Sequence, residues 1–411
     1  MGEGDNKLAS TYFLMQGIGT LISWNAILNG LDYFTKQFEG INVAFNFPIA
    51  VFVAQAVANL AIMKLSKKLS FTKRIIGPLV ILSIILFSIP IVTSKVAQTT
   101  EGFWTLMGIL FLLGFAGTVY QSSVSGLVSF FPGKYTSLFL SGTGFAGLVM
   151  NALRTIAILV FESGETVTTD TMTHEIIFYF AFASLILICC MIAHMVFIKT
   201  DYYLSHAKLI NAGKEDKEIS LTYNDYEGVS DGRASVQEET SGIATMIQVF
   251  KDAKVFILCL LINYIQTFVF YPGIMLKKPT ELEFSWKIVT MTTVFNIFDI
   301  VGKHVAQNRN SYNQNTVVVA TASRMAFFFT FIIQVVADIP FLNTLFFAYL
   351  NIAVFAFSNG FITTASFIMG PEKVEGKKKE VAGFLSMIGL TTGIMLGTFC
   401  ALPFQGLQPY A

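Results

Sequence analysis

The chain repeats long apolar segments, each about as long as a helix that crosses a lipid bilayer. We expect eleven such spans, at about 11–33, 44–64, 75–94, 103–131, 136–161, 176–198, 253–274, 286–303, 315–337, 341–369 and 380–403. The hydrocarbon core needs roughly 20 apolar residues per helix, and backbone groups have no water partner there, so each span should be helical. Only 13% of the residues are charged, about half the share typical of a soluble domain. The sequence therefore predicts an all-α polytopic membrane protein.

The segment 199–252 breaks this apolar pattern. It is rich in Lys, Glu, Asp, Ser and Gly and has no sustained apolar period, which is typical of a mostly disordered loop. It would separate an N-terminal six-helix bundle (1–198) from a C-terminal five-helix bundle (253–411). Such a 6+5 arrangement favours a transporter with its solute path between two bundles. A channel is the alternative, but no filter motif is visible.

The Lys and Arg residues predict the orientation of the chain. If the N-terminus is cytoplasmic and the spans alternate, the short cytoplasmic segments hold 13 Lys and Arg. The external segments hold 5, namely Lys36, Lys95, Lys277, Lys278 and Lys287. Positive residues favour the cytoplasmic side. We therefore expect a cytoplasmic N-terminus and 199–252 loop and an extracellular C-terminus. Residence in the plasma membrane is a separate expectation, which does not follow from these charges.

Two ionisable residues, Asp299 and Lys303, lie four apart near the end of the eighth span. A charge at the centre of a bilayer costs roughly 2.5–3.5 kcal/mol on insertion scales, so charges that remain there usually face a cavity or a partner. A spacing of four places both on one helix face, where they can pair. Asn296 shares that face with Asp299. The alternative is an interfacial pair whose Lys reaches toward the headgroups.

Two arginines also lie within predicted spans. Arg324 follows an uncharged stretch in the ninth span, and Asp299 is the acid expected to pair with it, at the edge of a cavity. Arg154 lies in the fifth span, and the sequence identifies no partner for it. We treat both arginines, with Asn296, as structural or gating candidates.

Uncharged side chains supply two further candidates. Trp24 and Asn25 lie mid-span in the first helix, away from the interfaces where Trp usually anchors. They could stack on and hydrogen-bond a flat heterocycle, or serve helix packing. Gln121 lies deep in the fourth span, where its amide needs a partner: a base edge or another helix would serve equally well.

Glycine-rich stretches have a packing explanation. Gly389, Gly393 and Gly397 recur every four residues, which lets helices approach closely. The segment 142–147 mimics a dinucleotide fingerprint but lies in a span without a preceding strand, so no cofactor is expected. No Ser/His, Asp/Asp or metal-binding constellation occurs within the spans, so neither an enzyme nor a metal site is expected.

These residues resemble the equilibrative nucleoside transporter family. The first span reads GIGTLISWNAILNGLDYF, similar to a family pattern that ends in Trp-Asn, with Ser23 where many members have Pro. The fourth and fifth contain YQSSVSGLVSFFPGKYTSLFLSGTGFAGLVMNAL, the eighth contains FNIFDIVGKHVA, and the tenth contains FAFSNGFITTASFIMGPEKV. Lys303 stands where the family usually has Arg. The resemblance covers nearly the whole membrane portion.

This resemblance implies an eleven-helix fold related to the major facilitators, and carriage of nucleosides or nucleobases by alternating access. By position, it implies that Leu21 and Trp24 line a pocket for the base, with Asn25 nearby, and that Gln121 hydrogen-bonds the base. We expect a monomer in the lipid bilayer with no nucleic-acid partner.

The resemblance further implies that Asp299 and Lys303 address the ribose hydroxyls, while Asn296 and Arg324 have structural or gating roles. Lys is a point charge rather than a planar fork, so the ribose contact would differ from the family's. Three alternatives stay open: a carrier of another polar solute such as a sugar or drug, a proton-coupled nucleoside symporter, and a membrane enzyme or scaffold.

Overall fold

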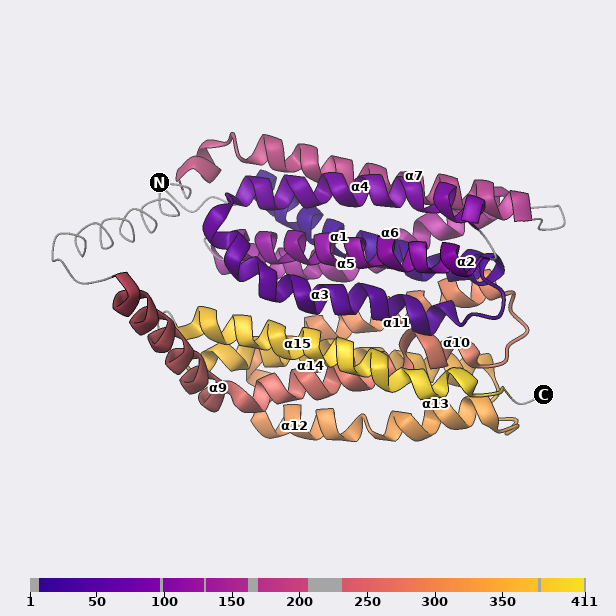
Figure 1. Cartoon of the computed structure of the whole chain (residues 1–411). Coiled ribbons are helices and arrows are strands. Elements are labelled where there is room, and N and C mark those ends of the chain that lie inside the picture. Colours follow the sequence, from indigo (N-terminus) through magenta and orange to yellow (C-terminus); the bar gives the residue numbers. More distant parts are fainter. Residues whose placement is uncertain are drawn as a thin grey trace.

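The computed structural model describes residues 7–96, 99–128, 131–161, 169–205, 231–375 and 378–409. Its long elements are all helical (Figure 1). The first group comprises α1 (Lys7–Asn29), α2 (Leu31–Gln37), α3 (Val43–Lys68), α4 (Phe71–Val96), α5 (Thr100–Val128), α6 (Gly133–Phe161) and α7 (Thr169–Phe197). The second comprises α9 (Asp231–Val269), α10 (Met275–Lys277), α11 (Phe284–Val305), α12 (Gln314–Ser323), α13 (Ala326–Val336), α14 (Leu345–Glu372) and α15 (Lys378–Ala401).

Nine helical segments of the described residues are long and apolar enough to cross a membrane. They correspond to the predicted spans other than the first two. Those two predicted spans fall on α1 and α3, which are helical, but α1 carries buried polar groups such as Gln16 and Asn29, and α3 qualifies only as a shorter apolar helix over Val43–Asn59. The prediction of a multi-pass helical membrane protein is therefore confirmed.

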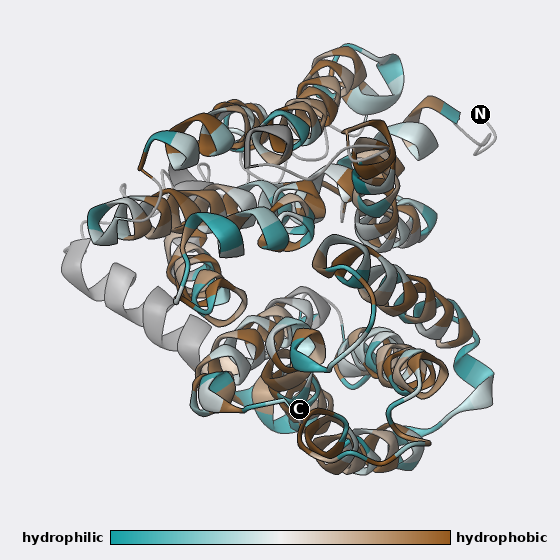
Figure 2. Cartoon of the chain, turned by 90° about the vertical axis from the view of Figure 1, so that its right-hand side faces the viewer, coloured by the Kyte–Doolittle hydropathy of each residue, from teal (hydrophilic) through white to brown (hydrophobic). Residues whose placement is uncertain are grey.

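The helices form two side-by-side groups. Helices α1–α7 lie in the upper half of Figure 1 and α9–α15 in the lower half, and the end-on view of Figure 2 shows the same separation. Within the first group α1 packs on α6 and α4 on α7, and within the second α9 packs on α15 and α11 on α14. The groups meet mainly where α6 contacts α11 and where α3 contacts α15. These two contacts form the main part of the interface between the groups.

Glycines make the closest helix contacts possible. A Cβ added to Gly389, Gly393 or Gly397 of α15 would lie 2.9, 2.5 or 2.6 Å from a backbone oxygen of α9. A Cβ on Gly142 of α6 would lie 2.3 Å from the backbone oxygen of Leu14 in α1. The packing explanation for both glycine stretches is therefore confirmed.

The prediction of a loop over 199–252 is wrong for residues 231–252, which are helical. Helix α9 begins at Asp231 and continues without a break into the membrane. Its Val249 is fully buried in a small apolar cluster with Val374 and Ala382. That tertiary contact supports the helix beyond its apolar run. Residues 206–230 lie outside the described residues.

Two predicted spans are interrupted helices. The span at 253–274 breaks at Tyr271, whose φ and ψ are −106° and 130°, before the chain resumes as α10. A residue that precedes a proline, here Pro272, is disfavoured in the helical region. The span at 315–337 divides into α12 and α13 at Arg324, where backbone bonds such as Phe327 N to Arg324 O (3.0 Å) tighten the turn.

We predict that Gly393→Ala destabilises the protein although alanine is the better helix former. The new methyl group would overlap the backbone of Leu261, and overpacking of this kind costs about 1–3 kcal/mol. Gly383→Ala on the same helix is the matched control, because a Cβ there meets nothing within 4 Å. The melting temperature of purified protein in detergent should fall for the first variant only. A fall of equal size in both would contradict close packing at Gly393.

Candidate functional site

Asp299 and Lys303 of α11 form an ion pair inside the helix bundle. The Lys303 Nζ lies 2.7 Å from the Asp299 Oδ2. The opposite face of α11 carries Ile297, Val301 and Val305, all more than 40% exposed, as lipid-facing residues should be. The Lys303 side chain nevertheless keeps 24% exposure on the inward face. The predicted pairing is confirmed, and the pair faces the interior of the bundle rather than lipid.

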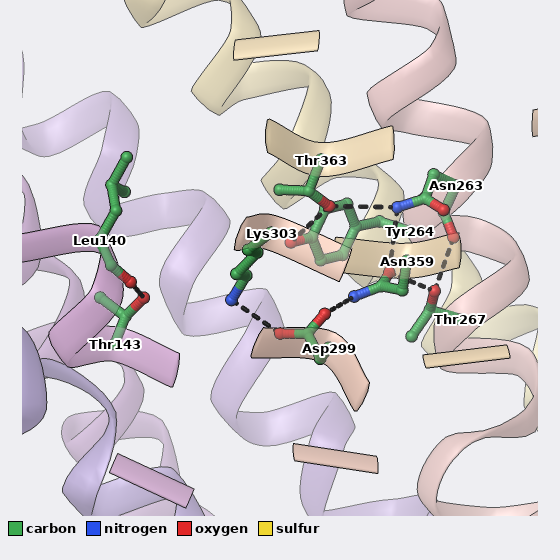
Figure 3. Close-up of polar contacts among 9 residues, drawn as sticks. All are labelled: Leu140, Thr143, Asn263, Tyr264, Thr267, Asp299, Lys303, Asn359 and Thr363. Carbon is green, nitrogen blue, oxygen red and sulfur yellow. Dashed lines mark hydrogen bonds and ion pairs between the residues drawn. The ribbon is translucent and has the colours of Figure 1, made fainter. Parts of the chain in front are cut away.

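The second oxygen of Asp299 is held by a neighbouring helix. Asn359 of α14 donates from Nδ2 to Asp299 Oδ1 at 2.8 Å, and its own Oδ1 accepts from Thr267 Oγ1 at 2.8 Å. Figure 3 shows this chain of contacts, with Asn263 of α9 donating to the same Asn359 oxygen. The helices approach closely here because a Cβ on Gly360 would lie only 2.0 Å from the Asp299 backbone oxygen.

Arg324 does not pair with Asp299, so that prediction is wrong. Its fully buried guanidinium donates to Phe355 O (2.6 Å), Ser358 Oγ (2.5 Å) and Thr267 Oγ1 (2.8 Å). It also lies 4.2 Å above the Phe355 ring centroid. A guanidinium has five donors, and neutral acceptors bind both terminal nitrogens of Arg324, while its Nε has no partner in the described residues. Among the described residues, hydrogen bonds connect Arg324 to Asp299 through Thr267 and Asn359.

A row of aromatic rings connects Trp24 to this polar cluster. The Trp24 ring centroid lies 4.8 Å from that of Phe52 in α3, and Phe52 lies 4.8 Å from Phe268 in α9. Phe268 stacks with Tyr264 at 6.4 Å. The Tyr264 hydroxyl accepts from Thr363 at 3.4 Å, beside the Asn263 and Asn359 contacts (Figure 3). The row crosses from one helix group to the other and ends at the ionised pair.

The residues predicted to line the base pocket differ in their burial and in their hydrogen bonds. Leu21 and Trp24 are half-buried. Asn25 donates from Nδ2 to Leu21 O at 2.9 Å, within its own helix, so its amide nitrogen serves α1 in this structure. Gln121 of α5 is half-buried, and within the described ranges its side chain has no hydrogen-bond partner. Its amide is thus available to a bound solute.

Asn296 lies one turn before Asp299 on the inward face of α11. Its buried Nδ2 has no hydrogen-bond partner in the described part of the chain. A Cβ on Gly147 of α6 would lie 2.2 Å from this nitrogen. Asn296 therefore lies where the two helix groups contact each other, which is consistent with the structural role expected for it.

Arg154 forms the centre of a second charged cluster, at the other end of α11. Its guanidinium pairs with Asp32 of α2 and Glu175 of α7. Both acids and Arg154 are at most 2% exposed. Asp32 Oδ2 also accepts a hydrogen bond from Ser285 Oγ of α11 at 2.6 Å. The sequence contains both acids, at the ends of predicted spans, but only the fold brings them to Arg154.

Amides and hydroxyls continue this contact along α11. Thr292 Oγ1 lies 3.2 Å from Asn29 Oδ1 of α1, and the side chains of Thr293 and Asn151 of α6 are hydrogen-bonded at 2.8 Å. Together with the Asp32–Ser285 bond, these contacts form what we term the polar seam between the helix groups. The polar seam lies at the right-hand end of α11 in Figure 1, near α2 and α10.

The fold is similar to those of solved membrane transporters. A solved structure titled as a D-xylose–proton symporter aligns with a TM-score of 0.61 and 11% identity, covering 96% of this chain and 89% of the other. A structure of a variant of the nucleoside transporter NupG aligns with a TM-score of 0.56 and 12% identity, over 95% and 90%. These likenesses show a fold of the major-facilitator type.

Residues 107–405 match the family described as nucleoside transporter, and the chain belongs to that family. Equilibrative nucleoside transporter 1 of Homo sapiens is 23% identical, with 96% of each chain covered. Equilibrative nucleoside transporter 4 of Danio rerio is 23% identical over 97% of this chain and 83% of its own. The family is one of transporters rather than enzymes.

We predict that Arg154→Met abolishes folding. Removing the cation leaves Asp32 and Glu175 buried without a counter-charge, which costs about 3–5 kcal/mol. Adding Asp32→Asn and Glu175→Gln to the same chain should restore a folded protein, because neutral amides need no counter-charge. Fluorescence-detected size-exclusion chromatography of detergent extracts provides the measurement. A sharp, stable peak for Arg154→Met alone would show that the cluster is not needed for folding.

Proposed function

We propose that the protein carries nucleosides across the membrane by alternating access. We expect it to carry nucleobases with lower affinity, because they have no ribose. Eleven spans would form a 6+5 pair of bundles, with α12 and α13 acting as one span. The supporting observation is the aromatic row from Trp24 to Tyr264, which leads from the first helix group to the polar cluster that holds the Asp299–Lys303 pair. A nucleoside has these two chemistries in one molecule.

In the proposed complex the base lies against Trp24 and Leu21, and Gln121 hydrogen-bonds its edge. Offset stacking on an aromatic ring contributes about 0.5–1.5 kcal/mol beyond burial. The ribose hydroxyls donate to Asp299, and the Lys303 ammonium donates to a ribose oxygen. An ammonium donates as a point charge and enforces less geometry than a guanidinium fork. We therefore expect broader tolerance of altered sugars than an arginine would allow.

The contacts of Asp299 support facilitated diffusion rather than proton symport. Both carboxylate oxygens already have donors, Lys303 at 2.7 Å and Asn359 at 2.8 Å. A proton on Asp299 would remove the negative charge that attracts the Lys303 ammonium, so the ion pair favours the ionised carboxylate. Uptake driven by an imposed proton gradient would overturn this part of the proposal.

We further propose a plasma-membrane protein with a cytoplasmic N-terminus. Under this orientation the polar seam lies at the extracellular end, where it would close the solute path. Alternating access would require α11 to leave α1 and α6, which breaks the Asp32–Ser285 bond and the contacts of Thr292 and Thr293.

Uptake of radiolabelled adenosine, inosine and uracil into transport-deficient cells or liposomes tests the function. We predict that Asp299→Asn lowers adenosine uptake about tenfold or more at equal surface expression, since a hydrogen bond to a charged group contributes about 1.5–3 kcal/mol. Asp338→Asn, which changes an acid in the exposed connection between α13 and α14, should transport normally. Normal uptake by Asp299→Asn would refute the assigned role, and no saturable uptake by the wild type would refute the function.

Opening of the polar seam has its own test. We predict that Ser285→Ala shifts the carrier toward its outward-open form, because Asp32 loses a donor from the second helix group. A membrane-impermeant maleimide should label Val289→Cys, on the buried face of α11, several-fold faster in the Ser285→Ala background. Native cysteines are replaced beforehand. Equal labelling rates in both backgrounds would contradict a role of the polar seam in closing the solute path.

A further inference from the structure

Two lysines at the seam end of the second helix group are buried without an acid partner. Lys278, between α10 and α11, is 3% exposed, and Lys287 in α11 is 8% exposed. Neither forms an ion pair within the described residues. The Lys287 ammonium lies 5.9 Å from the centroid of the Phe284 ring. A buried ammonium without a counter-charge is costly, so this pair requires an explanation that the carrier mechanism does not supply.

The nearby acids do not supply the missing negative charge. Glu281 and Glu283 are exposed in the short connection that precedes α11. Asp338 is exposed and accepts from Asn343 Nδ2 at 2.6 Å. The Lys278 Nζ donates instead to the neutral backbone oxygen of Asn343 at 3.1 Å.

A small cavity lies beside Lys278. It is lined by Lys278 and Gln334 together with apolar residues of α11, α13 and α14 and of the segment before α10, namely Ile274, Met275, Met291, Phe331, Val335, Ala348 and Ile352. Its volume is about 10 Å³, which is room for a single water-sized particle. No acid contributes to this lining.

The one polar amide in the cavity wall has a free donor. Gln334 of α13 is 2% exposed, and its Oε1 accepts from Asn351 Nδ2 at 3.1 Å. Its buried Nε2 has no hydrogen-bond partner in the described residues. Lys278 and Gln334 are thus the polar residues of this lining, and the side chain of each carries hydrogen-bond donors.

We propose that this cavity is a binding site for one small monovalent anion, chloride under ordinary conditions. Lys278 would supply the counter-charge, Gln334 Nε2 a hydrogen bond, and Lys287 additional positive potential. Met275 and Met291 are flexible enough to widen the cavity for an ion larger than water. Burial lowers the pKa of Lys278, and a bound anion would offset that effect by stabilising the charged amine.

The role of the anion would be structural. It would hold the start of α11 against α13 and α14, on the helix that also carries the polar seam and the Asp299–Lys303 pair. The site does not depend on which solute the carrier moves, so its test is separate from the uptake assays.

Thermal unfolding of the purified full-length protein tests the proposal. Melting temperatures are compared in sodium chloride, sodium bromide and sodium gluconate at equal ionic strength. We expect a saturable rise in chloride and in bromide relative to gluconate, because a ligand that binds only the folded state stabilises it. Lys278→Met should lose this rise, whereas Lys36→Met, which removes an exposed lysine from the same end of the molecule, should keep it.

A direct measurement on the wild type guards against a Lys278→Met variant that fails to fold. Crystals grown in bromide should show an anomalous peak between Lys278 and Gln334, and Gln334→Leu should weaken that peak. Equal melting temperatures in all three salts, or no anomalous peak in the cavity, would overturn the proposal and leave a water-filled hollow.

Discussion

The structure depends on one constraint: a charge inside the membrane must find its partners within the protein. Two clusters meet this constraint in different ways. Arg154 in the first helix group is paired with two acids, and all three side chains are buried. Asp299 is paired with Lys303 and Asn359, but Lys303 keeps a partly exposed side chain. The first cluster is therefore suited to hold helices together, and the second is suited to meet a solute.

Helix α11 links the two clusters. Ser285, Thr292, Asn296, Asp299 and Lys303 follow one another at spacings of seven, four, three and four residues, which places them on one helix face. The near end of this face contacts the first helix group through the polar seam, and the far end carries the ion pair. A solute that binds Asp299 and Lys303 thus contacts the same helix that must move for the polar seam to open. This shared helix is the physical basis we propose for alternating access.

The sequence predicted what local geometry determines. Asp299 and Lys303 lie on the same helix, so their spacing was enough to predict the pair. The glycines at intervals of four on α15 predicted close packing for the same reason. The partners of Arg154 and Arg324 could not be predicted, because Asp32, Glu175 and Thr267 belong to other helices whose placement only the fold determines. Phe52 and Phe268 could not be singled out among 41 phenylalanines.

The error over Arg324 has a physical origin. The sequence argument assumed that a buried cation requires an anion, whereas a guanidinium can be satisfied by a backbone oxygen, hydroxyls and an aromatic face. The error at 231–252 is similar, since the apolar period of the sequence is weak there and the contact of Val249 with the chain near α15 supports the helix. In both places tertiary contacts determined the structure, and an expectation based on the local sequence alone failed.

The account depends on a nucleoside lying between Trp24 and the Asp299–Lys303 pair, and a structure determined with bound adenosine tests this most directly. We predict density for the base against Trp24 and for the ribose within hydrogen-bond distance of Asp299 and Lys303. Density elsewhere, with Asp299 and Lys303 still contacting only the protein, would contradict the account.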